Sequence, residues 1–246
     1  MYLAHCPSRS LIERYTADDT HPYDMAVVVD ALRATATITH ALAMGARCVV
    51  PLADAPETLR HVGETNALVA VERGGKRMEG AQLGNDPAEY KRSLVAGKTI
   101  YLSTTNGTGA LRSLEQRSDA AIYIGAFTNL SAVAQLLSTR YADATVLIVG
   151  AGWKGRASLE DSLFAGYLAQ ELMHRGVRID PDDGTYLALL AAQHAGDGHV
   201  QAIAQGEHFK RLRAFLPFEA IAACLQRDTE QLVPRYDRLS RAILPE

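Results

Sequence analysis

The feature that most constrains the fold of this sequence is an alternation of short apolar runs and helical segments, repeated six times along the chain. The runs are Met25–Val29, Cys48–Val50, Ala67–Val71, Thr99–Leu102, Ala120–Ile124 and Thr145–Val149. Helix-like segments lie between them, at Thr37–Met44, Ala55–Val62, Thr108–Leu114 and Leu130–Leu137. Strands that alternate with helices of this length are typical of right-handed βαβ units. We therefore expect an α/β fold, with a mostly parallel sheet and helices on both faces in a three-layer α/β/α arrangement.

The last third of the chain departs from this alternation. Its clearest helix, Ser158–Arg175, carries an apolar stripe and is followed by Gly176, a residue type that commonly ends helices. After a possible short strand at Val177–Ile179, only helical patterns occur, at Tyr186–Ala192, Phe218–Leu225 and Thr229–Val233. No linker-like stretch is present. We expect one domain over 1–246, with an alternating core over 1–180 and a helical closing segment over 181–246.

Composition excludes several classes of protein. Charged residues make up 22% of the chain and the formal net charge is −3, so no basic field favours nucleic acid. The three cysteines, Cys6, Cys48 and Cys224, lie far apart without C-x-x-C spacing, which argues against disulfides and a zinc site. Neither a signal peptide nor a membrane-spanning run occurs. We expect a cytoplasmic protein with no nucleic-acid or membrane partner. The sequence does not indicate an oligomeric state, and a homodimer is expected only because it is the commonest assembly of soluble proteins.

The first apolar run leads into an acid, an arginine and a threonine where a helix should begin. Asp30 follows the buried strand directly, at the kind of sheet edge where α/β proteins bind ligands. Arg33 offers a rigid fork of donors for phosphate or carboxylate oxygens, and the helix N-terminus adds backbone N–H groups. A structural interpretation stays open at this point: Asp30 could pair with Arg33, and Thr35 could merely cap the helix.

Polar residues also follow four later strands. Glu72 ends the third run, and Thr105–Thr108, with Asn106 and Gly107 in its middle, follows the fourth. Asn129 comes after the fifth, and the glycine-rich stretch Gly150–Asp161 after the sixth. Because the carboxyl ends of parallel strands share one edge, we expect all these groups to converge. Carboxylates suit Mg²⁺, and glycine turns, hydroxyls and an arginine suit phosphate. The pattern predicts a pocket for Mg²⁺ and a small anionic phosphorylated substrate.

The stretch after the sixth run also contains a dinucleotide-like motif. Gly150, Gly152 and Gly155 form a literal G-x-G-x-x-G, with Asp180 near the position of the ribose-binding acid. An NAD(P)-binding oxidoreductase is therefore an alternative. Two features oppose it: the fingerprint normally opens the first unit of such a fold, and Glu160 with Asp161 would repel a pyrophosphate at the helix start. Arg156 and Ala157 stand where a P-loop needs Lys and Ser or Thr.

Other polar residues have simpler interpretations. Ser158 and Asp161 have the spacing of a capping box, which explains Asp161 but leaves Glu160 as the better candidate for chemistry. His194 and His199 flank a Gly-Asp-Gly turn and are expected at the surface. The basic run Lys210–Arg213 is expected to be a solvated helix face, with help in holding a dianionic substrate as the alternative.

Five motifs together resemble the 2-phosphosulfolactate phosphatase family and follow its order over about residues 25–170. They are Asp30-Ala-Leu-Arg-Ala-Thr35, Gly84-Asn-Asp-Pro87, Thr104-Thr-Asn-Gly-Thr108, Gly125-Ala-Phe-Thr-Asn129, and Gly150-Ala-Gly152 with Ser158-Leu-Glu-Asp161. The resemblance implies an α/β, Mg²⁺-dependent phosphatase that converts (2R)-2-phospho-3-sulfolactate to 3-sulfolactate, a step toward coenzyme M. Departures occur at Ala36, at Val71 and at Ala81–Gln82, where an acid is expected. They leave another 2-hydroxy-acid phosphate as an alternative substrate.

The resulting hypothesis is hydrolysis of a phosphomonoester, with Asp30, Arg33 and Glu160 as catalytic residues. Asp30 and Glu160 would hold Mg²⁺ directly or through its waters, with Glu72 and Asp161 as further candidates. The expected substrate contacts are Arg33, Thr35, Thr105, Asn106, Gly107, Thr108, Asn129, Lys154 and Arg156. Within this set, Asn106 and Asn129 would orient a carboxylate or sulfonate, and Lys154 or Arg156 would neutralise a second charge. A binding module without turnover is the remaining rival class.

Overall fold

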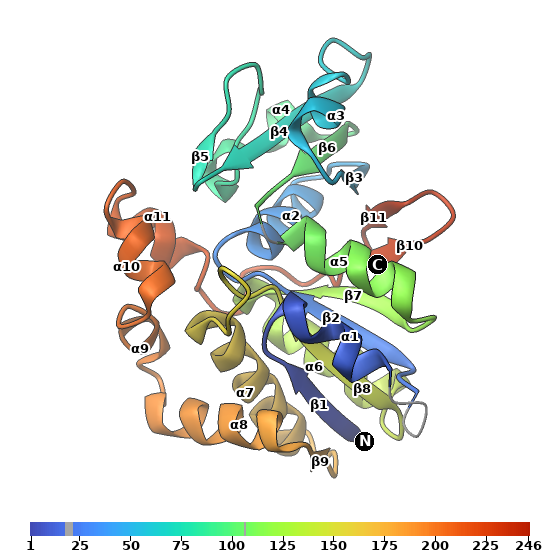
Figure 1. Cartoon of the computed structure of the whole chain (residues 1–246), viewed down its shortest axis with the longest axis vertical. Helices are drawn as coiled ribbons and strands as arrows, with labels where there is room; N and C mark the ends of the chain where they lie inside the picture. Colours follow the sequence, from blue (N-terminus) through green and yellow to red (C-terminus); the bar gives the residue numbers. More distant parts are fainter. Residues whose placement is uncertain (18–21, 106) are drawn as a thin grey trace.

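In the part of the chain that the structure describes, a mixed sheet of eleven strands organises the protein, in the order β5-β4-β6-β3-β11-β10-β7-β2-β8-β1-β9 (Figure 1). The computed structural model describes residues 1–17, 22–105 and 107–246. The strands are β1 Tyr2–Cys6, β2 Met25–Val29, β3 Cys48–Pro51, β4 Ala67–Arg73, β5 Lys76–Arg77, β6 Thr99–Ser103, β7 Ala121–Gly125, β8 Thr145–Gly150, β9 Asp180–Pro181, β10 Arg235–Asp237 and β11 Ala242–Leu244. The predicted α/β fold with a mostly parallel sheet is confirmed.

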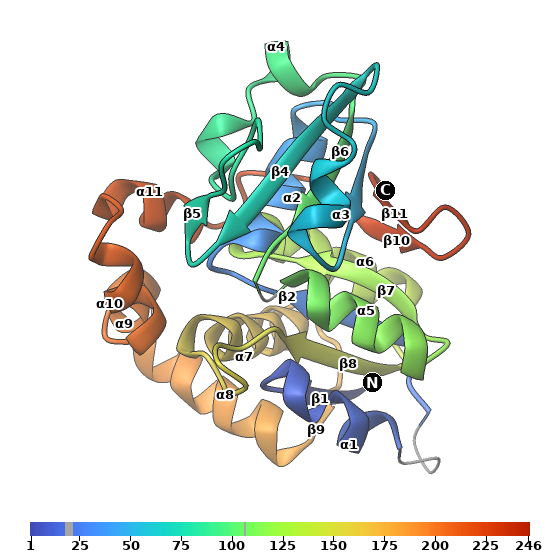
Figure 2. The same ribbon diagram turned by 45° about the horizontal axis from the view of Figure 1, so that its top comes forward.

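The sheet consists of two parallel groups joined by an antiparallel hairpin. One group is β7-β2-β8-β1 and the other is β3-β6-β4. The hairpin β10–β11 joins them through the single pairs Arg235–Tyr123 and Ile243–Val49, both antiparallel. Three antiparallel pairings in succession make the two groups run in opposite senses, and the views place them in opposite halves of the molecule (Figure 2). The expectation of one parallel sheet with a common edge for all strand ends is therefore wrong, although residues that follow β2, β4, β6 and β8 still converge on one cleft.

Helices cover both faces of the sheet. They are α1 Ile12–Thr16, α2 Ala34–Ala43, α3 Ala55–Leu59, α4 Arg92–Val95, α5 Gly107–Arg117, α6 Leu130–Arg140, α7 Leu159–His174, α8 Asp183–Ala195, α9 His199–Ile203, α10 Glu207–Arg213 and α11 Phe218–Ala223. Apolar residues of α6, α7 and α8 share one buried cluster with β2 and β8. Apolar residues of α1, α2 and α5 share a second cluster with the other face of the same strands. The two cores give the expected three layers.

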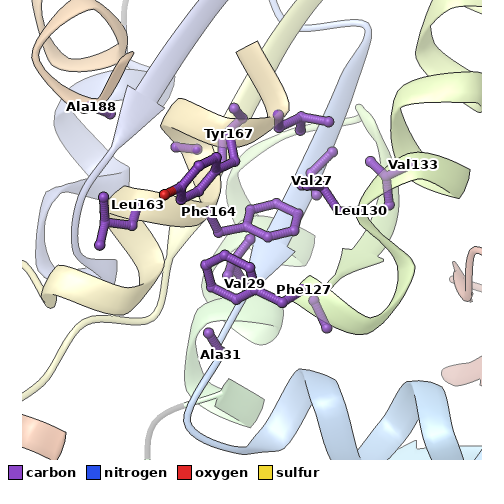
Figure 3. Close-up of a cluster of buried hydrophobic side chains, with 14 of the residues drawn as sticks. Val27, Val29, Ala31, Phe127, Leu130, Val133, Leu163, Phe164, Tyr167 and Ala188 are labelled. Carbon is purple, nitrogen blue, oxygen red and sulfur yellow. The ribbon is translucent and has the colours of Figure 1, made fainter. Parts of the chain in front are cut away.

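Strand β2 shows why its sequence is apolar without alternation. Met25, Val27 and Val29 point into the first core, whereas Ala26 and Val28 point into the second. All five are essentially inaccessible to solvent, which favours folding by about 1.5–3 kcal/mol for each fully buried valine. In the first core the rings of Phe127 and Phe164 meet edge to face, 5.8 Å apart, close to Val27 and Val29 (Figure 3). The strand is thereby fixed, and with it the turn that follows.

The chain termini differ from the sequence-based expectation. β1 is not among the apolar runs of the sequence, yet its five residues pair in parallel with β8 and bury the side chain of His5. The helix-only closing segment is wrong at Arg235–Leu244, where β10 and β11 return to the sheet. No helix forms at Thr229–Val233, because Pro234 follows and the backbone amide of Glu230 donates to Thr128 instead.

Three smaller expectations are also decided by the structure. Val177–Ile179 forms no strand, and the next two residues, Asp180–Pro181, pair with β1 instead. His194 is exposed as expected, but His199 is half-buried: its ring stacks on Phe127 and its Nε2 lies 2.8 Å from the Leu225 carbonyl. All three cysteines are free and buried. Within the described residues, no helix combines the length and apolar character needed to cross a membrane.

Candidate active site

A small polar cleft gathers residues from the ends of four strands and from a helix near the C-terminus. The lining residues are Asp30, Leu32, Arg33, Glu72, Gly75, Asn85, Thr105, Trp153, His208, Arg211 and Leu212. Apart from Asn85, which lies in the loop after β5, they follow β2, β4, β6 and β8 or belong to α10. The cavity measures about 40 Å³, room for about three water molecules. A group of phosphate size fits inside, and the rest of a ligand must lie at the mouth.

The turn between β2 and α2 presents Asp30 to this cleft. Thr35 fixes the turn, because its hydroxyl donates to the Asp30 carbonyl at 3.0 Å and accepts from the Asp30 amide at 3.1 Å. The peptide bond between Leu32 and Arg33 is cis. Thr35 was expected to contact substrate, but its hydroxyl is occupied by the backbone of Asp30 and lies outside the lining of the cleft.

Arg33 is only 4% exposed and spans the cleft between two segments. Its Nη2 donates to the Gly75 carbonyl at 2.8 Å, and its Nη1 lies 3.7 Å from the Asp86 carboxylate. Among the described residues its ion-pair partner is therefore Asp86, and the alternative of an Asp30–Arg33 pair is not realised. A guanidinium has five N–H donors, so these two contacts leave others for a ligand in the cleft.

Glu72 organises the opposite wall. Its carboxylate accepts from the Gly75 amide at 2.5 Å and from both the amide and the hydroxyl of Thr105, at 3.3 and 3.1 Å. Gly75 has a φ of +87°, and a Cβ there would lie 2.4 Å from the Phe215 ring. The β4–β5 turn thus packs directly against the residues that follow α10, which lie on the same side of the molecule in both views (Figures 1 and 2).

Glu160 and His208 form a buried pair beside Asp30. His208 Nδ1 donates to Glu160 Oε1 at 2.6 Å, although 47 residues separate them in the chain. Glu160 is 1% exposed, and its second oxygen, Oε2, has no hydrogen-bond partner. The His208 ring stacks nearly parallel on Trp153, with centroids 5.6 Å apart. The carboxylate of Glu160 at the start of α7 and the imidazole of His208 in α10 are thereby held in contact beside the Trp153 ring.

The pKa values show that negative charge is crowded here. Burial raises the pKa of Asp30 to about 6; the charge of His208 opposes the shift, and those of Glu72 and Glu160 add to it. Burial, followed by the charges of Glu160 and Asp30, raises the pKa of Asp161 to about 8. Burial lowers the pKa of His208, but the hydrogen bond and charge of Glu160 outweigh it and raise the pKa overall. These acids need a compensating cation or a proton.

Asp161 is a structural tie between two loops. Its Oδ1 accepts from the Ala31 amide at 2.9 Å and its Oδ2 from the Gly152 amide at 3.0 Å. The expected capping box is wrong, because the Ser158 side chain makes no cap hydrogen bond. Gly152 has a φ of +64°, and a Cβ there would lie 2.2 Å from the Arg156 carbonyl oxygen. The turn itself therefore requires this glycine. Because the Gly152 amide already donates to Asp161, it is not free to bind the pyrophosphate of a dinucleotide.

The remaining predicted substrate contacts lie in different places. Asn129 is fully buried outside the cleft lining, and its amide group bonds to the backbone at Ala126, Ile124 and Leu232. Thr108 donates through its hydroxyl to the Thr104 carbonyl in the first turn of α5. At Gly107 a Cβ would lie 3.0 Å from Asp30 Oδ2. Lys154 and Arg156 are exposed beside Trp153, and Asn106 lies outside the described residues.

Comparison with known proteins identifies the family. The sequence model of the family described as 2-phosphosulpholactate phosphatase matches residues 11–238. The chain belongs to this family. A relative from Synechococcus sp. (strain WH7803) is 40% identical over 194 residues, 77% of this chain and 78% of its own length. Relatives from Thermotoga maritima and Clostridium acetobutylicum are 37% and 35% identical, over 85% and 86% of this chain and 87% and 88% of their own lengths. All three are named "Probable 2-phosphosulfolactate phosphatase".

The resemblance drawn from five motifs is thus confirmed, and the family match also covers residues that the motifs did not single out. His208 and Arg211 line the cleft within the matched span. No sequence motif connects either residue to Glu160. The basic run Lys210–Arg213 is the one sequence pattern that drew attention to this helix. Asn85 was quoted only as part of a motif, yet it is 5% exposed, lines the cleft and leaves its Oδ1 without a hydrogen-bond partner.

The donor set fits a magnesium ion that is bound mainly by water and substrate. Within the part of the chain that the structure describes, no cluster of three His, Cys, Asp or Glu side chains could hold a metal by itself. Magnesium, however, usually takes one or two carboxylates and keeps several waters. Asp30 lines the cleft. Glu160 does not line it, but it bonds to His208, which does, and its Oε2 is buried without a partner. These are the two carboxylates that would serve such an ion.

Proposed function

We propose that this chain is a Mg²⁺-dependent phosphomonoester hydrolase that converts 2-phosphosulfolactate, the (2R) form of 2-phospho-3-sulfolactate, to 3-sulfolactate and phosphate, the reaction type of coenzyme M synthesis. Membership of the family supports the reaction. The observation that carries the proposal is the buried guanidinium of Arg33, which faces a cleft of phosphate size lined by Asp30 and Glu72. A phosphoryl group needs such a combination of donors and cation-binding acids.

Asp30 and Glu160 would hold the metal. Bound magnesium would neutralise phosphoryl charge and position the attacking and leaving oxygens. Glu72 and Asp161 stay candidates for contact through metal-bound water, because hydrogen bonds within the protein already engage their carboxylates. His208 holds Glu160 in one orientation, since its Nδ1 bonds to one oxygen and leaves the other oxygen free.

The chain itself would bind and orient the phosphoryl group. Arg33 donates to its oxygens and stabilises their charge as the bond to the leaving oxygen breaks. Thr105, tied to Glu72 at the cleft wall, lies where its backbone and hydroxyl border the same space. Asn85 also lines the cleft, and its unpartnered Oδ1 is an acceptor, so it would face a water or a hydroxyl group and not a phosphoryl oxygen.

The experiment is a panel of phosphomonoesters that includes 2-phosphosulfolactate, phospholactate and p-nitrophenyl phosphate, assayed with Mg²⁺ and with EDTA. The proposal requires turnover with Mg²⁺, loss with EDTA, and the highest kcat/KM for 2-phosphosulfolactate. A rapid-quench search for labelled Asp30 separates a phosphoenzyme from direct attack by water. Ligand response without turnover of any ester would instead identify a binding module, and stabilisation by NAD alone an oxidoreductase.

A second substrate class, other 2-hydroxy-acid phosphates, was suggested by the missing acid at Gln82. In the structure Gln82 is exposed and its Oε1 accepts from the Val69 amide at 2.9 Å, outside the cleft lining. The departure at this position therefore removes no group from the site, which favours the family's own substrate. Preference for phospholactate over 2-phosphosulfolactate in the same panel would reverse that choice.

A further inference from the structure

Arg211 is a cleft residue that the proposed chemistry leaves without a role. Its guanidinium lies over two aromatic rings, 5.6 Å from the centroid of Trp153 and 5.8 Å from that of Phe215. No carboxylate in the described part of the chain forms an ion pair with it. It is half-buried and lines the same cleft as Arg33. A cation placed on rings rather than on an acid keeps its N–H donors available for an anion.

Other cations near this mouth share that arrangement. Lys154 Nζ lies 4.5 Å from the Trp153 ring centroid, and Lys76 Nζ lies 5.7 Å from that of Phe215. Both lysines are exposed, and neither forms an ion pair among the residues that the structure describes. By contrast, Arg33 is almost completely buried and supplies the positive charge in the interior of the cleft. The cleft thus has positive charge at two depths, which suits a ligand with two separate anionic groups.

The position of Arg211 is set by buried contacts on its own helix. His208 and Leu212 lie three residues before it and one after it, line the cleft with it, and are buried. His208 is fixed by Glu160, and the neighbouring Phe215 packs on the Gly75 turn. Lys210 and Arg213 of the same helix are exposed and do not line the cleft. One face of α10 therefore points into the site, and Arg211 is the positively charged residue on that face.

We infer that Arg211, supported by Trp153, is the specificity-determining contact for an anionic group of the substrate other than its phosphoryl group, either the sulfonate or the carboxylate, which stays at the mouth while the phosphoryl group enters the cavity. This inference rests on the proposed function. The guanidinium fork can bond two oxygens of such a group at once, which a lysine cannot do. The cavity of about 40 Å³ suits one phosphoryl group, so a second anionic group would lie toward the half-buried Arg211 that lines the same cleft.

The test compares Arg211→Gln and Arg211→Lys with Arg213→Gln, an exposed position on the same helix. Each protein is assayed with 2-phosphosulfolactate and with p-nitrophenyl phosphate, which has no second anionic group. Arg211→Gln should raise KM for 2-phosphosulfolactate by at least about tenfold and leave kcat/KM for p-nitrophenyl phosphate within about twofold. Arg211→Lys should fall between it and the parent, and Arg213→Gln should match the parent. Equal losses on both substrates, or no loss on either, would overturn the inference.

A binding measurement separates this inference from the proposed function. If the parent protein hydrolyses no ester of the panel, the proposed function fails, and titration calorimetry with 3-sulfolactate then tests Arg211 alone. Binding to the parent that is weakened in Arg211→Gln and kept in Arg213→Gln supports the subsite. Equal affinity of the parent and Arg211→Gln, or no binding to the parent, rejects it. Arg211→Lys keeps the stem that packs on the rings and serves as the folded reference if Arg211→Gln unfolds.

Discussion

At the scale of single residues, Arg33 joins two functions that the sequence presented as alternatives. It supports the structure through the Gly75 carbonyl and Asp86, and it still faces the cleft. Asp30, three residues earlier, faces the same cleft but is buried beside Glu160 and His208 rather than paired with Arg33. A single segment therefore supplies both the acid and the guanidinium of the site.

Replacing Arg33 with lysine should separate these two functions. Arg33→Lys keeps the charge and loses the fork, so kcat/KM should fall by about 100-fold or more while the melting temperature changes little. Arg33→Ala should in addition cost about 1–3 kcal/mol of unfolding free energy, because the Gly75 carbonyl and Asp86 lose their donor. Steady-state kinetics and urea unfolding measure the two effects, with Arg77→Lys, at an exposed ion pair with Glu89, as the control. Full activity in Arg33→Lys would show that the guanidinium fork is not needed for catalysis.

Glu160 leads to a second prediction at this scale. If its free oxygen holds Mg²⁺, Glu160→Gln should raise the Mg²⁺ concentration for half-maximal activity by about tenfold or more. The matched control is Glu171→Gln on the same helix, where the carboxylate pairs with Arg175 at the surface. Magnesium titrations of both variants measure the shift. A lower kcat with an unchanged magnesium requirement would limit Glu160 to holding His208.

The sequence predicted part of the site because its residues lie at strand ends. Asp30, Arg33 and Glu160 each lie close to the end of an apolar strand or the start of a clear helix, so local pattern placed them. His208 and Arg211 could not be found in this way, because their approach to Glu160 depends on how α8 to α10 return over the sheet. Asn129 and Thr35 have the expected residue types, but the backbone occupies their polar groups.

At the scale of elements, the strands with long apolar runs were predictable and the short connecting strands were not. β10 and β11 have three residues each, and β10 is Arg235-Tyr-Asp237, which has no strand pattern of its own. Their pairing with β7 and β3 is a tertiary contact that local sequence does not encode. Because this hairpin reverses the sense of the second parallel group, its omission led to the wrong expectation of a single parallel sheet edge, although the predicted convergence holds for the ends of β2, β4, β6 and β8.

The contact between the β4–β5 turn and the segment after α10 should be detectable through glycine substitutions. Gly75 and Gly63 have nearly the same φ, +87° and +89°, but a Cβ at Gly63 would meet nothing within 4 Å. Gly63→Ala should therefore cost only the backbone term of about 1–2 kcal/mol. Gly75→Ala should cost more and reduce activity, since the Phe215 ring must move and Arg33 bonds to this turn. Equal unfolding free energies and full activity in both variants would mean that this contact does not hold the site together.

At the scale of the whole molecule, the alternation of strands and helices correctly predicted an α/β fold with covered sheet faces. It predicted less well how the two ends of the chain join the sheet. β1 inserts beside β8 although it contains His5, and that histidine is 2% exposed with its Nε2 unpartnered. A buried neutral histidine affects the stability of the folded state as a whole, because unfolding allows it to take up a proton.

Stability should therefore decrease on acidification through His5. Burial lowers the pKa of His5 from 6.5 to about 4, although the charge of Asp182 opposes the shift. Between these values the unfolded chain binds a proton that the folded protein does not, so this contribution is complete above about pH 6.5 and is lost as the pH falls toward 4. At pH 5 the loss approaches about 2 kcal/mol. Asp30 and Asp161, whose pKa values are raised, act in the opposite sense, so the measurement must be a difference between proteins.

Urea unfolding at pH 7.5 and pH 5 measures this difference. The unfolding free energy should decrease less for His5→Gln than for the parent, and the exposed control His194→Gln should show the same decrease as the parent. Equal decreases in all three proteins would show that His5 already gains its proton in the folded state.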